Sequence, residues 1–356
     1  MAMNNTSADA DFDLLCAQAR SIVDDIGFRW VLGVEIIVTI PGSMFNLILM
    51  SIIFRLSVYH TNLRCLLFHQ SLNLALFTAA TMSKSIYILV VGYALDQACS
   101  LITPLYTCKL LELFTIMPII NSIYSFTIVC LERLYATINY RTYDASSKIP
   151  WLAIVLIPTV WFISFVYQLT PLPSIPKNRY LPVCANLLSI SAKAATGSLT
   201  QCLIMETIAL SLVVALYFIN THKMKQSLLN RAKHSLAARF QISQNIEVNS
   251  LLIPSLLAHA ACFLPIIAYL ILVTCGLDLS LNTKMLLIHV QYVWISFYAI
   301  VHPLLALTKD SHCRKLYTSF VPTSWKMCTR RQKPKNVLTE TDLHFKSLER
   351  MWALKY

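Results

Sequence analysis

Hydrophobic residues along this chain gather into seven long stretches that short polar segments separate. A helix of about 20 apolar residues matches the roughly 30 Å hydrocarbon core of a bilayer. Inside hydrocarbon, a helix satisfies all of its own backbone hydrogen bonds. The predicted spans are residues 30–54, 65–91, 107–131, 149–169, 198–219, 250–274 and 284–307. The pattern therefore predicts an all-α membrane protein, built as a bundle of seven transmembrane helices.

The composition agrees with this interpretation, because 56% of the residues are hydrophobic and only 13% are charged. A soluble domain with these proportions would expose a large apolar surface to water. We expect an extracellular segment at 1–29, the bundle at 30–307 and a cytoplasmic tail at 308–356. Within the tail, residues 310–320 predict a short amphipathic helix along the inner leaflet.

Lysine and arginine are concentrated in every second gap between the spans, 21 on one side against five on the other. Cytoplasmic loops carry such an excess, so the N-terminus lies outside and the tail lies in the cytoplasm. The excess of basic residues on the inner side makes up most of the net charge of +12. Attraction to anionic membrane lipid explains much of this charge, so no nucleic-acid partner is expected. On the outer side, Asn4 and Asn5 begin overlapping N-glycosylation sequons.

Three cysteines, Cys99, Cys108 and Cys184, fall at or near the outer surface, where disulfides persist. A bond between Cys108 and Cys184 would hold the loop 170–197 over the mouth of the bundle. We expect free thiols at the cysteines inside the cell or the membrane, which are Cys65, Cys130, Cys262, Cys313 and Cys328.

Ionisable residues inside a membrane are costly and therefore mark candidate functional sites. Glu35, Lys84, Glu112 and Glu206 all fall within about 12 Å of the outer face at the rise of an α-helix. Lys109 shares one helix face with Glu112. This placement predicts a polar cavity in the outer half that opens to the outside. The alternative is a buried pair between Lys84 and a glutamate that only holds two helices together.

We expect a small molecule to bind among these charges and neighbouring aromatic residues. The candidate ligand-binding residues are Lys84, Glu112, Thr115, Glu206, Tyr269 and Tyr292. Enzyme chemistry is not expected, and no catalytic residue, cofactor or metal site is predicted. His69, His259 and His289 lie at different depths and cannot surround one metal, so each is interpreted as a packed or hydrogen-bonded residue.

The inner end of the third span carries an acid–base pair, Glu132 and Arg133. Arg133 follows Cys108 by 25 residues, or about 37 Å of helix, so it lies at the cytoplasmic boundary. An arginine at this depth can be held by Glu132 in one state and offered to a partner in another. The pair therefore predicts a conformational switch.

Residues 132–134 (Glu-Arg-Leu) resemble the acid-Arg-Tyr motif of rhodopsin-like G-protein-coupled receptors. Residues 262–265 (Cys-Phe-Leu-Pro) resemble the hinge of the sixth helix in that class, with Phe263 in place of tryptophan before Pro265. The last span keeps the proline of the class at Pro303.

A nearer resemblance is to the nematode chemoreceptor superfamily that contains the Sra, Srab, Srb and Sre families. Residues 132–137, followed by Tyr143, look like the second inner loop of that superfamily, and residues 60–63 look like the first. Residues 235–241 are similar to the third inner loop, and residues 344–348 are similar to Sre C-termini. The chain is thus identified as a member of the superfamily, with the Sre family as the expected subdivision.

The resemblance implies a rhodopsin-like, multi-pass receptor of the plasma membrane, in the sensory cilium of neurons. Its partners would be an odorant or pheromone-like chemical cue, membrane lipid and a heterotrimeric G protein, and a receptor dimer stays open. The sixth helix would swing about Pro265 as Arg133 leaves Glu132. The alternative is a seven-helix ligand-gated channel or a transporter. The charge count opposes a channel with an inner N-terminus, and the lack of an internal repeat in the sequence disfavours a transporter.

Overall fold

The computed structural model describes residues 6–55, 59–140, 143, 150–170, 179–185, 192–229, 236–275 and 279–309. Among these residues, seven helices are long and apolar enough to cross a membrane, which confirms the predicted bundle. They are α2 (Ile26–Arg55), α3 (Thr61–Tyr87, continued by the π-helix η1, Ile88–Ala94), α4 (Leu105–Ile138), α5 (Trp151–Leu169), α7 (Ala192–Leu229), α8 (Leu236–Cys275) and α9 (Leu281–Lys309). The sequons at Asn4 and Asn5 and the predicted helix 310–320 lie outside the described residues.

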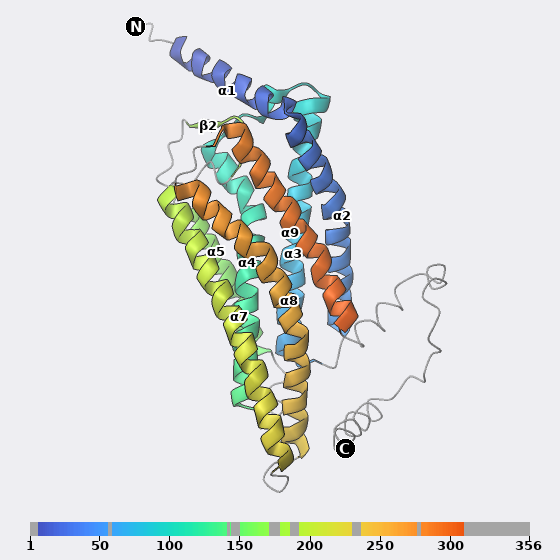
Figure 1. Cartoon of the computed structure of the whole chain (residues 1–356). Coiled ribbons are helices and arrows are strands. Elements are labelled where there is room, and N and C mark those ends of the chain that lie inside the picture. Colours follow the sequence, from blue (N-terminus) through green and yellow to red (C-terminus); the bar gives the residue numbers. More distant parts are fainter. Residues whose placement is uncertain are drawn as a thin grey trace, which may run out of the picture. The chain divides into compact units, whose positions relative to one another are not determined.

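Helix α4 is the central element of the bundle (Figure 1). In its apolar window, 67% of the residues are buried, against 22% in α5 at the periphery. It packs against α3, α5, α7 and α8, while α2 packs between α3 and α9. The residues that α4 carries are therefore the ones that can communicate with most of the other helices.

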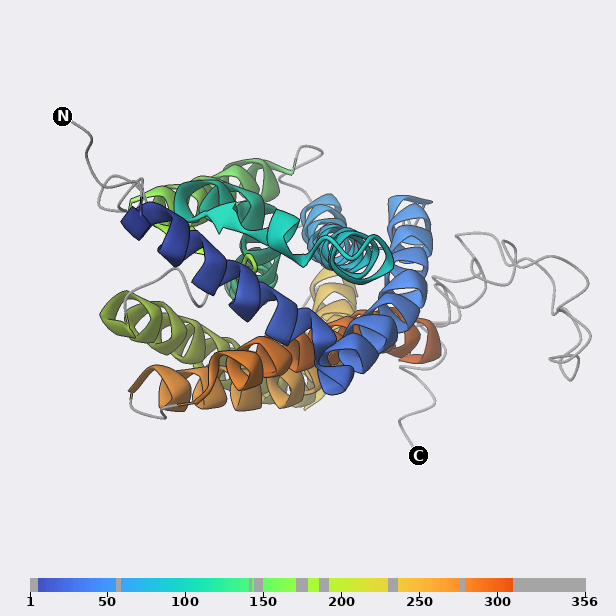
Figure 2. The same ribbon diagram turned by 90° about the horizontal axis from the view of Figure 1, so that it is seen from above.

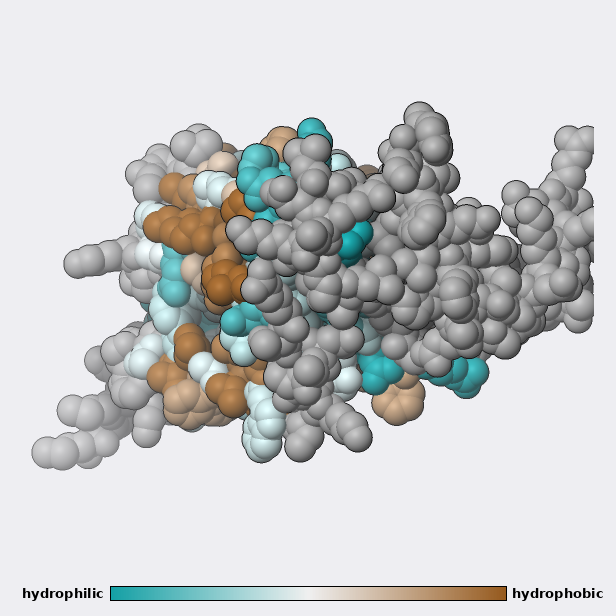
Figure 3. All heavy atoms as spheres, turned by 90° about the horizontal axis from the view of Figure 1, so that it is seen from below, coloured by the Kyte–Doolittle hydropathy of each residue, from teal (hydrophilic) through white to brown (hydrophobic). Residues whose placement is uncertain are grey.

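The outward faces of the helices are apolar, as contact with lipid requires. Large side chains such as Trp30 and Phe54 on α2 and Phe162 on α5 are exposed by 72%, 78% and 67%. A view from the inner end shows strongly hydrophobic patches on the flanks, with hydrophilic residues between them (Figure 3). In water such a surface would drive aggregation, but in a bilayer it is the surface expected to face lipid.

Two helices extend farther than the hydrophobic stretches predict. Helix α7 continues to Leu229 and α8 begins at Leu236, so both run past the apolar segments into the polar region at the inner end. Polar residues end an apolar run without ending a helix, because Lys, Gln and Arg are good helix formers. The extension of α7 is anchored to α4, since the Asn220 side chain donates to the Thr137 hydroxyl at 3.0 Å.

A helix also forms in the N-terminal segment, for which the sequence predicted only an extracellular location. This helix, α1 (Thr6–Asp24), crosses above the outer end of the bundle (Figure 2). It buries a small apolar face formed by Ala19, Ile22 and Val23. A disulfide joins Cys16 to Cys99 in the 3₁₀-helix η2 (Ala98–Leu101), with the two Cα atoms 4.7 Å apart.

The loop before α7 is held against the outer end of α4, as the sequence predicted. Cys108 and Cys184 form a disulfide, with Cα atoms 5.3 Å apart. Two short strands, β1 (Thr103–Pro104) and β2 (Tyr180–Leu181), pair antiparallel beside it. The loop inserts the buried side chains of Leu181, Val183 and Ala185 into the outer end of the bundle. Together, α1 and this loop segment cover part of the outer face.

We predict that Cys108→Ser lowers stability by about 2–4 kcal/mol, because it removes the constraint that the disulfide places on the unfolded chain. Thermal unfolding of purified receptor in detergent measures the change. Alkylation without reductant should label Cys184 in this variant and leave it unlabelled in the wild type. Cys65→Ser, at a cysteine that is free in the structure, serves as the control. Labelling of Cys184 in the wild type would contradict the assignment.

Candidate functional site

At the inner end of α4, the Arg133 guanidinium is buried and held by several partners. Its Nε and Nη2 atoms donate to the two carboxylate oxygens of Glu132, which is also fully buried. Its Nη1 atom donates to Asn245 Oδ1 on α8 at 3.5 Å. The Asn245 amide in turn donates to the carbonyl of Ala136 at 3.4 Å. Arg133 therefore connects α4 to α8 while Glu132 neutralises its charge.

Tyr143, between α4 and α5, closes this arrangement from the side of the inner loops. Its hydroxyl donates to Glu132 and lies 3.0 Å from His60 Nδ1. His60 precedes α3, and its ring accepts a hydrogen bond from the backbone N–H of Asn62. Burial, together with the negative charge of Glu132, raises the pKa of Tyr143, so its hydroxyl remains a donor at neutral pH. We call the group His60, Glu132, Arg133, Tyr143 and Asn245 the inner latch.

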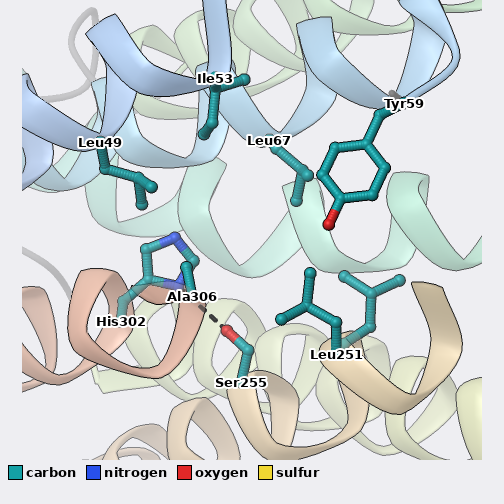
Figure 4. A pocket seen from close by; sticks show the side chains of 9 residues that line it. Leu49, Ile53, Tyr59, Leu67, Leu251, Ser255, His302 and Ala306 are labelled. Carbon is teal, nitrogen blue, oxygen red and sulfur yellow. Dashed lines mark hydrogen bonds between the residues drawn. The ribbon is translucent and has the colours of Figure 1, made fainter. Parts of the chain in front are cut away.

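A small cavity lies among α2, α3, α8 and α9 in the inner half (Figure 4). Its volume of about 30 Å³ exceeds the roughly 10–15 Å³ that one water molecule needs. Apolar side chains such as Leu49 and Ile53 line it, together with Tyr59 and the pair Ser255 and His302, whose Oγ and Nδ1 atoms are 3.0 Å apart. In this region α8 is less tightly packed against its neighbours than a filled core would be.

Farther outward on α8, His259 connects four helices. Its Nδ1 atom lies 2.8 Å from Glu206 Oε1 on α7, and both side chains are fully buried. Its Nε2 atom lies 3.4 Å from the Ser122 hydroxyl on α4, which accepts a hydrogen bond from Gln70 on α3. The imidazole stacks on Phe263 with ring centroids 4.0 Å apart and an interplanar angle of 10°. The predicted hinge residue is therefore packed against this hydrogen-bonded chain.

In the outer half, the structure brings three of the predicted ligand-binding residues together. Lys84 on α3 forms an ion pair with Glu112 on α4. The Lys84 ammonium also lies 5.5 Å from the ring centroid of Tyr292 on α9. Thr115 is buried on α4, one turn farther inward. The pair that the sequence offered as an alternative to a cavity is thus present.

A second buried pair extends this group toward α2. Glu35 Oε2 lies 2.7 Å from His289 Nδ1 on α9, and both side chains are fully buried. The His289 ring meets the edge of Tyr292 at 5.5 Å, and the Cys184 sulfur in the outer loop lies 3.9 Å from Glu112. We call Glu35, Lys84, Glu112, His289 and Tyr292 the outer network. It joins α2, α3, α4 and α9 beneath the loop.

The other predicted site residues lie apart from the outer network. Glu206 pairs with His259, and Tyr269 is half-buried, with a hydroxyl that has no hydrogen-bond partner among the described residues. Pro265 is exposed on α8, whereas Pro303 is buried in α9. The histidine partners were missed as site residues.

Depth in the membrane is a sequence signal that is compatible with one of these pairs, Glu35 and His289. Glu35 lies nine residues after Ile26, the first residue of α2, and His289 lies eight residues after Leu281, the first residue of α9. The two side chains therefore start at similar distances from the outer ends of their helices. Matching depth makes pairing across the bundle geometrically feasible, although it does not show which helices are neighbours.

We predict that Lys84→Ala destabilises the bundle by about 3–5 kcal/mol, because it leaves the Glu112 carboxylate buried without its cation. The double variant Lys84→Met with Glu112→Met should regain most of that loss, since apolar side chains can replace a buried pair at little cost. Thermal unfolding in lipid nanodiscs measures both changes. Lys284→Ala, at a partly exposed lysine of α9, is the control. A double variant as unstable as the single one would show that Lys84 and Glu112 do not act as a pair.

Comparison with known proteins agrees with this architecture. Residues 13–352 match the family model described as "Serpentine type 7TM GPCR chemoreceptor Sra". The chain is also similar to serpentine receptor class alpha/beta-14 of Caenorhabditis elegans, with 24% identity over 292 residues, or 75% of this chain and 74% of that relative. The predicted nematode chemoreceptor superfamily is confirmed, whereas assignment to the Sre family is not.

Since the family model covers most of the chain, including all seven spans, the similarity extends beyond a single motif. The family is one of receptors and not of enzymes, in agreement with the prediction that the chain has no catalytic activity. This multi-pass membrane protein belongs to the Sra family of serpentine seven-transmembrane G-protein-coupled chemoreceptors.

Proposed function

We propose that this receptor binds an odorant- or pheromone-like molecule in the outer half of the bundle and activates a heterotrimeric G protein at its inner face, in the plasma membrane of a sensory cilium. The observation that carries the proposal is the inner latch. It buries a guanidinium at the cytoplasmic boundary and ties it to α8 by one long hydrogen bond to Asn245, at 3.5 Å. A cation held in this way can become available to a partner when α8 moves.

The outer network supplies polar groups for a ligand. Glu35 Oε1 and Glu112 Oε2 are buried and have no hydrogen-bond partner among the described residues. A buried acceptor that lacks a donor costs about 1–3 kcal/mol, so a ligand that supplies a donor gains that energy. Tyr292 and Thr115 are buried beside Glu112 and would restrict the shape of such a ligand. We therefore assign ligand contacts to Lys84, Glu112, Thr115, Glu206, Tyr269 and Tyr292.

Helix α8 is the element that would carry the signal between the two ends. It contacts α7 through His259 and Glu206, and it contacts α4 through Asn245 and Arg133. His259 and Asn245 are 14 residues apart, or about 21 Å along one helix. Pro265 lies within α8 and removes a backbone donor there, which favours bending near the stacked Phe263.

A modest difference in affinity is sufficient for such a switch. A coupling energy of about 1–3 kcal/mol changes affinity about 5- to 150-fold between the two states. The free energy of the hydrogen bond from Arg133 to Asn245 is of the same size as this coupling energy. On activation we expect the α-subunit of the G protein to contact residues 132–144 and 223–239, a set that includes Arg133.

We predict that Arg133→Ala abolishes ligand-stimulated nucleotide exchange on the G protein, because the partner loses its cation. In contrast, Glu132→Gln should raise basal exchange by several-fold, because the neutral amide holds the guanidinium less strongly. Exchange is measured at matched surface expression, with a screened odorant mixture as stimulus. Glu247→Gln is the matched control, since Glu247 is an exposed acidic residue two positions from Asn245.

If Arg133→Ala retained full stimulated exchange, the proposed coupling through the latch would be wrong. A current or an uptake signal in the same membranes, with no exchange in the wild type, would instead support a channel or a transporter.

A further inference from the structure

A shallow groove lies between α5 and α7, with α4 as its floor. Both α5 and α7 pack against α4. The groove is lined by Tyr124 of α4, by Ile163, Ser164 and Tyr167 of α5, and by Gln201 and Cys202 of α7. Gln201 is exposed and Ile163 is 48% exposed, so the groove opens on the outward face of the bundle. The lining residues of α5 and α7 lie near the outer ends of those helices.

The groove is mostly apolar, and Ile120 of α4 also lines it, but it carries a few polar side chains. Gln201 carries an exposed amide where the neighbouring side chains of α5 and α7 are mostly apolar. Ser164, buried in the wall, donates to Asn121 Oδ1 at 2.6 Å. Because polar groups are costly in hydrocarbon unless they are hydrogen-bonded, such a lining favours a ligand that brings a polar atom.

The size of the groove limits what it accepts. Its volume of about 20 Å³ exceeds the roughly 10–15 Å³ that one water molecule needs, so a hydroxyl-sized group fits in it. Ile204 and Ile208 follow Gln201 on the same face of α7, at spacings of three and seven residues, and are 52% and 46% exposed. They form an apolar track that leads inward from the groove along the membrane-facing surface. A hydroxyl-sized head group in the groove would therefore place an apolar chain on this track.

We propose that this groove is a second ligand site, which recognises the polar head of a membrane-dissolved amphiphile, an apolar molecule with one hydroxyl-sized group. It shares no residue with the ligand contacts assigned above, so the inference goes beyond the proposed function and does not depend on it. A molecule of this kind reaches the groove from the bilayer, without passing α1 and the loop segment Tyr180–Ala185, which cover part of the outer face.

The groove is also well placed to affect α8. Cys202 lies one helical turn from Glu206 on α7. Glu206 is fully buried, and its Oε2 atom has no hydrogen-bond partner among the described residues, while its Oε1 atom pairs with His259. A shift of α7 at the groove would change the geometry of the link between α7 and α8.

The test uses a medium-chain alcohol that carries a photoreactive diazirine and an alkyne, with the full receptor in lipid nanodiscs. After irradiation, mass spectrometry maps the adducts. We expect adducts on the peptides of α4, α5 and α7 that line the groove, and we expect excess 1-decanol to displace them while decane, which lacks the hydroxyl, does not. The variant Gln201→Leu with Tyr124→Phe should reduce displaceable labelling about 2- to 10-fold, the range for losing one hydrogen bond of 0.5–1.5 kcal/mol.

Phe162→Leu is the matched control, because Phe162 is exposed on α5 next to the groove but does not line it, and it should label as the wild type does. Adducts spread over the exposed faces of α2 and α5, without displacement by 1-decanol, would mean adventitious membrane labelling and would overturn the proposal. Equal displacement by decane would overturn the assignment of a polar head. Arg133→Ala keeps the groove and should label normally, so labelling tests the groove independently of G-protein coupling.

Discussion

The cost of an unpaired charge in a low-dielectric interior is the constraint on which this bundle depends. Each of four fully or nearly fully buried carboxylates has a basic partner. The pairs are Glu35–His289, Lys84–Glu112, Glu206–His259 and Glu132–Arg133. The first three each join two different helices, so they favour one set of neighbours and one register among the helices. Since lipid is as apolar as the helix faces, burial of apolar side chains alone gives less selectivity.

Such pairs specify an arrangement more than they stabilise it, because apolar residues of similar volume can often replace them at little cost. The fourth pair differs from the others, since Glu132 and Arg133 are neighbours in sequence and neutralise each other without crossing to another helix. The link from this pair to α8 is then a hydrogen bond from Arg133 to Asn245 at the long distance of 3.5 Å. Helix α8 is therefore held more weakly at its inner end than at His259, where the distance to Glu206 is 2.8 Å.

The parts of the fold that were predictable from the sequence depend on local composition or on fixed spacing. Seven apolar stretches predicted the spans, and the interval from Cys108 to Arg133 placed a disulfide at one end of α4 and a buried ion pair at the other. Helix α1 was not predicted, because its buried face is small and its anchor, Cys16, pairs with a cysteine 83 residues away. The inner extensions of α7 and α8 were missed because hydropathy reports the edge of the membrane and not the end of a helix.

The histidine partners show a second limit of sequence-based interpretation. Each carboxylate was identified as costly, but its partner depends on helix rotation and on which helices are adjacent, and a single sequence specifies neither. His289 and His259 were interpreted as packed or hydrogen-bonded residues, and they do pack against aromatic rings and contact carboxylates. Their carboxylate contacts depend on the packing of α2 against α9 and of α7 against α8.

The distribution of covalent links along the bundle indicates where motion can occur. Two disulfides connect α1, η2, α4 and the outer loop at the outer end, whereas Cys65 and Cys130, in the inner half, are free thiols. The small cavity beside Ser255 and His302 adds room on the inner side of α8. A packed element with one braced end and one weakly held end responds to a small displacement by pivoting, and not by uniform deformation. A ligand that shifts α7 or α8 near Glu206 would therefore produce its largest displacement at Asn245, where the latch holds Arg133.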